Sequence, residues 1–523
     1  MNSWLTTILV FLPVAGALAC FVLPLRGEAI ASFALLVSLV EVGVWIDALA
    51  RFDFSRGLQL DQRASWFSDL NVSYHVGLFG FSLWLVGLTV VVMAAAVSYA
   101  VLAGRDRPRA YYGLMLLLTG AIVGVFSSQD LLLFYVMFEA MLIPLYVLVG
   151  VWGGAGRLAA TFKFVAFTMA GSLLMLVAII VLGLSQGTFD LVDSPTSSSD
   201  WIFLGFAAAF AVKAPLFPFH GWLPDAYREA SPEVSAVLSG IVSKAAAFGF
   251  LRIAIAKFPG PTHDFRTPIL VLAVVGLVYG SVLAFRAPDV RGVIAYSSLS
   301  QMGLITLGLF ASNDLGFDGA VLQMVNHGLI SATLFLLAGA IERRTSTGEF
   351  VLLGGMSRGR PALATVLMTT GIIALAVPGS AAFAGEFLIL AGALQQDWLY
   401  AVVGATAIVL AAMYMLRLIS GVLHEDVGPA VPEAALDLRV AELAIVVPLV
   451  ASLLALSAWP AAVSEHSFAG NAVPSVATNF REAASTARYR PPRTPATPHG
   501  TMLNEGPQSE PGATATVEFA PSP

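Results

Sequence analysis

Charged residues are scarce in this chain of 523 residues, where they make up 11% of the sequence against about 25% in soluble globular domains. Hydrophobic residues make up 58%, and apolar runs long enough to cross a bilayer recur along most of the length. This composition excludes an ordinary soluble enzyme. It predicts an all-α, polytopic membrane protein whose main solvent is the lipid bilayer.

Cysteine is nearly absent, since Cys20 is the only one, so an intrachain disulfide is excluded. The seven histidines are scattered without metal-ligand spacing, and we expect neither a bound metal nor an iron–sulfur cluster in this chain. Basic blocks are also missing, and the net charge is −6 at pH 7. These features argue against a nucleic-acid partner.

The hydrophobic runs predict about fourteen transmembrane helices. They are residues 5–23, 30–48, 78–100, 111–126, 131–149, 164–184, 201–219, 234–255, 269–285, 293–310, 320–341, 362–394, 400–418 and 443–459. Loops after odd-numbered spans hold most of the arginines, which places both termini outside the cytoplasm. Residues 461–523 are rich in Pro, Ala, Thr and Ser, and we expect a disordered tail there.

Four ionisable residues lie inside apolar spans, namely Glu139, Lys213, Lys244 and Glu386. An ionised group near the bilayer centre costs about 2.5–3.5 kcal/mol even on translocon scales, so each should face protein or water. A relay that hands protons along the membrane plane is the functional interpretation. Structural ion pairs that fix helix register are the alternative.

Two of these residues stand beside helix-breaking sequences. Pro215 and Pro218 follow Lys213 in the seventh span, and Pro378 with Gly379 precedes Glu386 in the twelfth. Interrupted helices at corresponding positions of two halves are typical of inverted repeats in ion transporters. We therefore expect discontinuous helices 7 and 12.

The same reasoning divides the chain into five parts. They are N-terminal helices 1–3 (1–110), a first repeat of helices 4–8 (111–256), a second of helices 9–13 (267–420), a loop with helix 14 (421–460), and the tail (461–523). Lys244 lies among small residues between the two breaks and suits a relay. His327 and His220 are further candidates, with a core histidine and a turn histidine as the alternatives.

Six motifs resemble the antiporter-like membrane subunits of respiratory complex I, and within that family the M-type chains of bacterial NADH–quinone oxidoreductase. The motifs are residues 130–144, 213–226, 294–298, 326–328, 378–387 and 413–416. The resemblance covers roughly residues 70–460. It implies fourteen helices, two inverted five-helix repeats, and proton translocation driven by quinone reduction elsewhere in a complex.

The resemblance also implies roles for single residues. Glu139 and Lys213 would form a controlling ion pair, Lys244 would be the central relay, and Glu386 would lead to the exit half-channel. It implies no cofactor in this chain, because NADH, FMN, iron–sulfur clusters and quinone would belong to partner subunits. The implied partners are other membrane subunits of complex I, especially adjacent antiporter-like chains, in the lipid bilayer of a bacterial cytoplasmic membrane.

The sequence departs from the family pattern at a few positions. Phe79 stands where an acid is usual, Gln301 replaces a usual histidine, Arg291-Gly292 replaces Lys-Arg, and Glu233 is unusual. Three other assignments stay open from the sequence. These are the D-type subunit of a Mrp-like sodium/proton antiporter, the membrane subunit of a related hydrogenase, and a passive scaffold whose buried charges only hold helices together.

Overall fold

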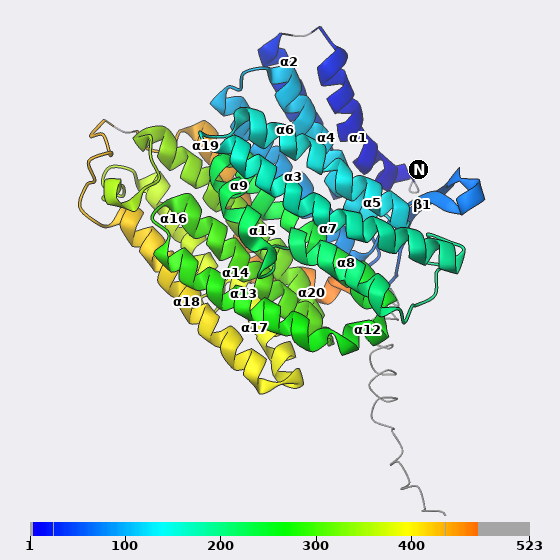
Figure 1. The fold of residues 1–523 in the computed structure, drawn as a ribbon. Coiled ribbons are helices and arrows are strands. Elements are labelled where there is room, and N and C mark those ends of the chain that lie inside the picture. Colours follow the sequence, from blue (N-terminus) through cyan, green and yellow to red (C-terminus); the bar gives the residue numbers. More distant parts are fainter. Residues whose placement is uncertain (1–3, 25, 435, 469–523) are drawn as a thin grey trace, which may run out of the picture. The chain divides into compact units, whose positions relative to one another are not determined.

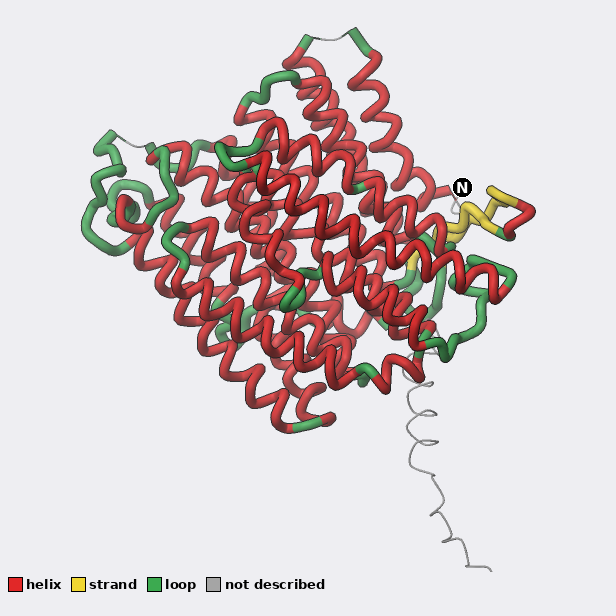
Figure 2. The backbone as a smooth tube through the Cα atoms, viewed as in Figure 1, coloured by secondary structure: helices red, strands yellow, loops and turns green. Residues whose placement is uncertain are grey.

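The computed structural model describes residues 4–24, 26–434 and 436–468, which form a bundle of helices (Figures 1 and 2). Within these residues, twelve helical segments are long and apolar enough to cross a membrane. Two further apolar helices are shorter, Pro361–Ala374 and Ala381–Gln396. The structure therefore agrees with a multi-pass helical membrane protein.

The first half of the chain contains eleven α-helices and two π-helical segments among its described residues. In order they are α1 (Leu5–Val22), α2 (Gly27–Arg51), α3 (Gly80–Ala103), α4 (Pro108–Ser127), α5 (Leu131–Ala140), α6 (Leu142–Trp152), α7 (Arg157–Gln186), α8 (Asp200–Lys213), α9 (Leu223–Glu229), α10 (Pro232–Val237), η4 (Leu238–Val242), α11 (Ser243–Gly249) and η5 (Phe250–Ile255). The segments from α10 to η5 follow one another without a gap, as one long span.

The second half continues this pattern. Its helices are α12 (Pro259–Asp264), α13 (Arg266–Arg286), α14 (Val290–Ala311), α15 (Asp314–Thr345), α16 (Pro361–Ala374), α17 (Ala381–Gln396), α18 (Trp398–Leu423), α19 (Val440–Ala458) and α20 (Ala461–Ser467). Helix α15 is fully enclosed, as is the span from α10 to η5, because α3, α10, α14, α17 and α19 all pack around it. It can therefore carry polar side chains away from lipid.

The prediction of an all-α chain misses a β-hairpin, drawn in yellow in Figure 2. Strands β1 (Gln59–Phe67) and β2 (Val72–Leu78) pair antiparallel, and Asn71 at the turn has a left-handed backbone with φ of +51°. The hairpin is anchored because Ser73 N donates to the Asp130 carboxylate at 3.0 Å. Long-range anchoring of this kind leaves no trace in a hydropathy pattern.

The predicted start of the disordered tail at residue 461 is also wrong. Residues Ala461–Ser467 form helix α20, which packs against α3 and α15. Val463 is fully buried, and the Phe468 ring stacks on Phe81 at 5.5 Å. Packing of these few apolar side chains orders the segment although its composition is polar. The rest of the predicted tail, residues 469–523, lies outside the described residues.

Local sequence features set where the site helices begin and end. The Asp130 side chain accepts hydrogen bonds from the Leu132 and Leu133 amides and so caps α5, which carries Glu139. Ser380 caps α17 through the Phe383 amide and thereby fixes the start of the helix that carries Glu386. Helix α8 ends at Lys213, ahead of Pro215, which cannot donate a backbone hydrogen bond.

Candidate functional site

Lys213 is the last residue of α8, and its side chain is buried. Its Nζ donates a hydrogen bond to the Phe138 carbonyl at 3.1 Å and lies 3.8 Å from the centre of the Phe138 ring. A carbonyl and an aromatic face both stabilise an ammonium group. The helix end and its proline-rich continuation therefore hold an amine against α5.

Glu139 follows Phe138 directly in α5 and is only partly buried. Both residues of the expected ion pair are described, yet Glu139 and Lys213 make no contact within the 4.0 Å that defines an ion pair. The expected pair is not formed in this structure, because Lys213 is hydrogen-bonded to the neighbouring carbonyl instead. The two groups remain within electrostatic reach of each other.

Lys244 lies in α11 between the π-helical segments η4 and η5, and its side chain is completely buried. Its Nζ donates to the Ser239 carbonyl at 2.5 Å and approaches the Ser243 hydroxyl at 3.4 Å. His327 in α15 is also buried and within electrostatic reach of Lys244. Both predicted residues therefore lie in the buried interior, and no hydrogen bond joins them.

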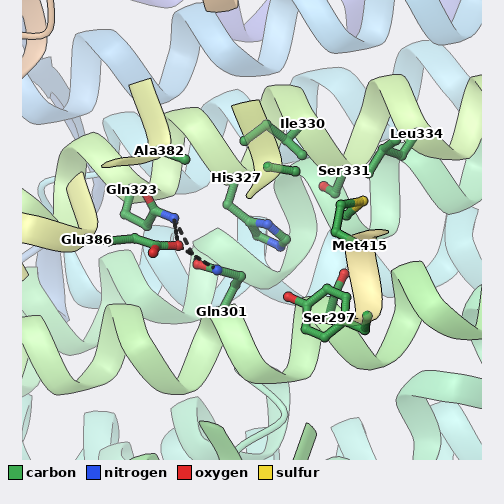
Figure 3. Close-up of a pocket in the computed structure, with 12 residues that line it drawn as sticks. Ser297, Gln301, Gln323, His327, Ile330, Ser331, Leu334, Ala382, Glu386 and Met415 are labelled. Atoms are coloured by element: carbon green, nitrogen blue, oxygen red, sulfur yellow. Dashed lines mark hydrogen bonds between the residues drawn. The ribbon is translucent and has the colours of Figure 1, made fainter. Parts of the chain in front are cut away.

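Glu386 lies in α17 with 1% of its surface exposed. Its Oε1 accepts hydrogen bonds from Gln301 Nε2 at 2.9 Å and from Gln323 Nε2 at 3.4 Å (Figure 3). Its Oε2 and the His327 Nε2 are buried without a hydrogen-bond partner among the described residues. Unpartnered buried polar atoms of this kind indicate a place for water or for a transferred proton.

A small cavity connects Glu386 with His327. It measures about 20 Å³ and is also lined by Gln301, Gln323 and Tyr414. That volume is sufficient for about one water molecule. In Figure 3 the His327 ring lies beside the Gln301, Gln323 and Glu386 cluster. His327 and Glu386 therefore share one small polar cavity, and Lys244 lies outside its lining.

The two halves of the predicted relay are separated by aromatic rings. Phe138, which holds Lys213, packs on Phe210 at 6.2 Å and on Phe134 at 5.5 Å. Phe134 in turn stacks near Phe248, one helical turn from Lys244, at 6.4 Å. Aromatic packing thus lies between Phe138, which holds Lys213, and the helix that carries Lys244.

His220 stands apart from both halves of the predicted relay. It lies in the short helix η3 (Phe219–Trp222), which follows the break after α8. Its ring stacks on Phe217 at 5.6 Å and meets Tyr279 edge-on at 5.2 Å. Its Nδ1 is buried without a hydrogen-bond partner. These contacts are compatible with both interpretations of His220, a structural residue of the turn and a residue at a proton entrance.

Sequence reasoning missed the amides that hold Glu386. Gln301 stands out in the sequence only as a departure from a family pattern, and Gln323 does not stand out at all, yet Gln323 Nε2 also donates to Gln301 Oε1 at 2.8 Å. The signal that could have found them is a glutamine inside an apolar span, which needs a polar partner. Among the described residues, no group of three or more His, Cys, Asp or Glu could hold a metal ion.

Comparisons with known proteins agree with this geometry. Residues 128–411 match the family model described as NADH:quinone oxidoreductase/Mrp antiporter, TM. A relative from Rhodobacter capsulatus, NADH-quinone oxidoreductase subunit M, is 36% identical over 486 residues, covering 88% of this chain and 94% of the relative. The chain belongs to the NADH:quinone oxidoreductase/Mrp antiporter family. The resemblance to the antiporter-like subunits of complex I is thereby confirmed.

Other members of this family give the same result. The NADH-quinone oxidoreductase subunit M of Mycobacterium tuberculosis is 36% identical over 510 residues, covering 88% of this chain and 92% of the relative. A chain of respiratory complex I from Thermus thermophilus with bound NADH has a TM-score of 0.83 at 29% identity, covering 91% of this chain and 99% of that one. A chain of the Mrp complex from Dietzia has a TM-score of 0.82 at 22% identity, covering 92% and 99%, which shows the shared fold alone.

Proposed function

We propose that this chain is an M-type, proton-translocating membrane subunit of a respiratory complex I. The relatives from Rhodobacter capsulatus and Mycobacterium tuberculosis support this assignment, because they are named subunit M and this chain covers 94% and 92% of them. The observation that carries the mechanism is the water-sized cavity that His327 and Glu386 line, with the buried Lys244 amine within electrostatic reach of His327. Such groups inside a membrane protein mark proton relays.

Protons would move through two groups of residues in turn. Lys213 would alternate between the Phe138 carbonyl, which it contacts here, and the Glu139 carboxylate, which is on the next residue of α5. A shift of this charge would change the proton occupancy of Lys244, because like charges compete in a low-dielectric interior. Lys244 would then pass its proton through His327 and the cavity to Glu386.

The membrane arrangement belongs to the same proposal. Fourteen crossings would result if α8 and α9 form one interrupted span and α16 and α17 form another. The gaps support this, since α8 ends at Lys213 and α9 begins at Leu223, while α16 ends at Ala374 and α17 begins at Ala381. Helices α4 to η5 and α13 to α18 would be the inverted repeats. The arginine-rich loops would face the cytoplasm, and both termini the exterior, of a bacterial cytoplasmic membrane.

Partner subunits would supply the redox chemistry. NADH, FMN, iron–sulfur clusters and quinone would all bind elsewhere in the complex, and adjacent antiporter-like chains would contact this one in the membrane. A Mrp-type antiporter subunit has the same fold. Purification from membranes distinguishes the two, because copurification with flavin and iron–sulfur subunits is expected for complex I and their absence would favour an antiporter.

Two variants test the relay in the assembled complex, Lys213→Ala and Glu139→Gln. We expect each complex to assemble, with much slower proton pumping into reconstituted liposomes during NADH oxidation, because each variant removes one charge that controls Lys244. Arg358→Ala removes an exposed cation and is the control. Normal pumping by both fully assembled variants would reject the relay and leave the passive scaffold.

A further inference from the structure

A groove of about 520 Å³ opens on the arginine-rich side of the bundle, and none of the relay residues lines it. Arg105, Arg228 and Arg291 line it, and each is paired with a carboxylate of Glu233, Asp289 or Glu342. Two of these acids, Asp289 and Glu342, line the groove themselves. Glu233 differs from them, because it lies beneath the groove and is completely buried.

The carboxylate of Glu233 is connected to the groove by side chains. Arg105 Nη2 lies 2.7 Å from it, and the Tyr111 hydroxyl donates a short hydrogen bond to it. Tyr111 also lies 3.2 Å from the hydroxyl of Ser231, which lines the groove. Tyr99 and Tyr112 are the other titratable groups within electrostatic reach. The Tyr111 hydroxyl thus connects the buried Glu233 carboxylate to Ser231 at the groove.

Glu233 and Lys244 lie on the same continuous span. Lys244 follows Glu233 by eleven positions, which corresponds to three helical turns and about 16 Å. The span contains the π-helical segment η4, and segments of this kind are frequent at functional sites. The two ionisable groups therefore share a helix that runs from the groove to the centre of the bundle.

Polar groups occupy the distance between them. Ser235 Oγ lies 3.2 Å from the Ser231 carbonyl and 2.8 Å from the Tyr227 carbonyl. The Tyr227 hydroxyl donates to the Leu238 carbonyl at 3.1 Å and interacts with Ser243, whose hydroxyl is 3.4 Å from Lys244 Nζ. Each of these side chains is buried. They form a file of spaced polar groups inside otherwise apolar packing, and the Ser235 and Tyr227 hydroxyls in it each donate to a backbone carbonyl and not to one another.

We propose that Glu233 is the proton-loading residue for Lys244 on the arginine-rich side. Its carboxylate takes a proton from hydronium in the groove, which leaves water, and then releases that proton along the file to the neutral amine of Lys244, which becomes an ammonium. Water completes the steps between hydroxyls. Arg105 keeps its charge throughout and favours the return of Glu233 to the carboxylate. This proposal rests on the proposed function, since it supplies the relay with protons.

The variant Glu233→Gln in the whole complex tests this proposal. The amide keeps the volume and an acceptor for Tyr111 but exchanges no proton. We expect normal assembly and a several-fold slower initial rate of proton pumping into liposomes, with a deficit that grows as the pH rises. The deficit grows because Lys244 must then be loaded directly from bulk protons, whose concentration falls with pH. Glu229→Gln, which changes an acid lining the same groove, should pump normally at every pH.

The outcomes separate this proposal from the relay itself. Unchanged pumping by Glu233→Gln at all pH values, while Lys213→Ala is slow, would overturn the loading role alone. A deficit independent of pH would assign the Arg105 and Glu233 pair to structure instead. Should Glu233→Gln fail to assemble, Tyr111→Phe still breaks the link to the groove. Normal pumping by that variant at high pH would likewise overturn the proposal, whereas the same pH-dependent loss would support it.

Discussion

Two glutamine side chains hold the Glu386 carboxylate in place. Gln301 and Gln323 both donate to its Oε1, while its Oε2 is left without a partner beside the cavity. An amide pair of this kind holds the carboxyl group in place in either protonation state, because glutamine donors serve a carboxylate oxygen and a carbonyl oxygen alike. In the proposed relay, this free oxygen would be the atom that gains or loses the proton.

The variant Glu386→Gln keeps the hydrogen bonds that hold this side chain in place but removes its ability to exchange a proton. The new amide oxygen still accepts from Gln301 and Gln323, so assembly and thermal stability of the complex should change little. Proton pumping should fall strongly, because an amide cannot carry the proton. The measurement is pumping into liposomes, with Glu425→Gln, an exposed carboxylate, as the control. An assembled Glu386→Gln complex that pumps at the normal rate would remove Glu386 from the relay.

Outside the membrane spans, the Asp190 carboxylate holds the β-hairpin through a hydrogen bond with His75 of β2. Burial raises the pKa of its carboxyl, but the hydrogen bond from His75 and two backbone amides outweigh burial and lower the pKa to about 2. A lowered carboxyl pKa stabilises the folded state above about pH 4, and this contribution is lost only as the pH falls through about 2. The contribution of the Asp190 carboxylate to the attachment of the β-hairpin is therefore fully present at neutral pH.

The variant Asp190→Asn should loosen that attachment by about 2 kcal/mol, the free energy that corresponds to such a pKa shift. Hydrogen exchange of the β2 amides at neutral pH measures it, and we expect faster exchange in the variant. Asp193→Asn is the control, because Asp193 is largely exposed and contacts only Arg63 of the hairpin. Equal exchange in both variants would show that Asp190 does not anchor the strand.

Close packing of helix α15 against helix α17 also positions the site around Glu386. A Cβ atom added at Gly319 in α15 would lie 2.7 Å from the Ile389 amide nitrogen and 3.0 Å from the Gly385 carbonyl oxygen of α17. Backbone cannot move aside as a flexible side chain does, so α15 and α17 approach closely only because this residue is glycine. That approach brings Gln323 of α15 to Glu386.

The variant Gly319→Ala should separate α15 from α17 and cost about 1–3 kcal/mol, the usual range for overpacking. We expect a lower thermal unfolding temperature of the purified complex and slower pumping, because Gln323 would move away from Glu386. Gly43→Ala in α2 is the matched control, since an added Cβ there has no atom within 4 Å. If the two variants had equal stability, close packing of α15 on α17 would not support the site.

For the whole molecule, the sequence predicts the lipid-facing spans and the buried charges well, because both depend on composition along one helix. It does not predict the β-hairpin, the helix α20 or the interruption between α5 and α6 at Met141, since each depends on contacts with distant segments. The four ionisable residues could be named from their apolar surroundings. The placement of Lys213 on a carbonyl and the aromatic rings before Lys244 require the packed structure.

The central claim is that buried amines in this chain exchange protons, and Lys244→Arg in the assembled complex tests it most directly. Arginine keeps a positive charge and a long side chain, but its pKa above about 12 prevents it from giving up a proton. Proton pumping during NADH oxidation, measured in liposomes beside the unaltered complex, is the readout. We predict normal assembly with pumping largely lost, and a Lys244→Arg complex that pumps at the unaltered rate would contradict the account.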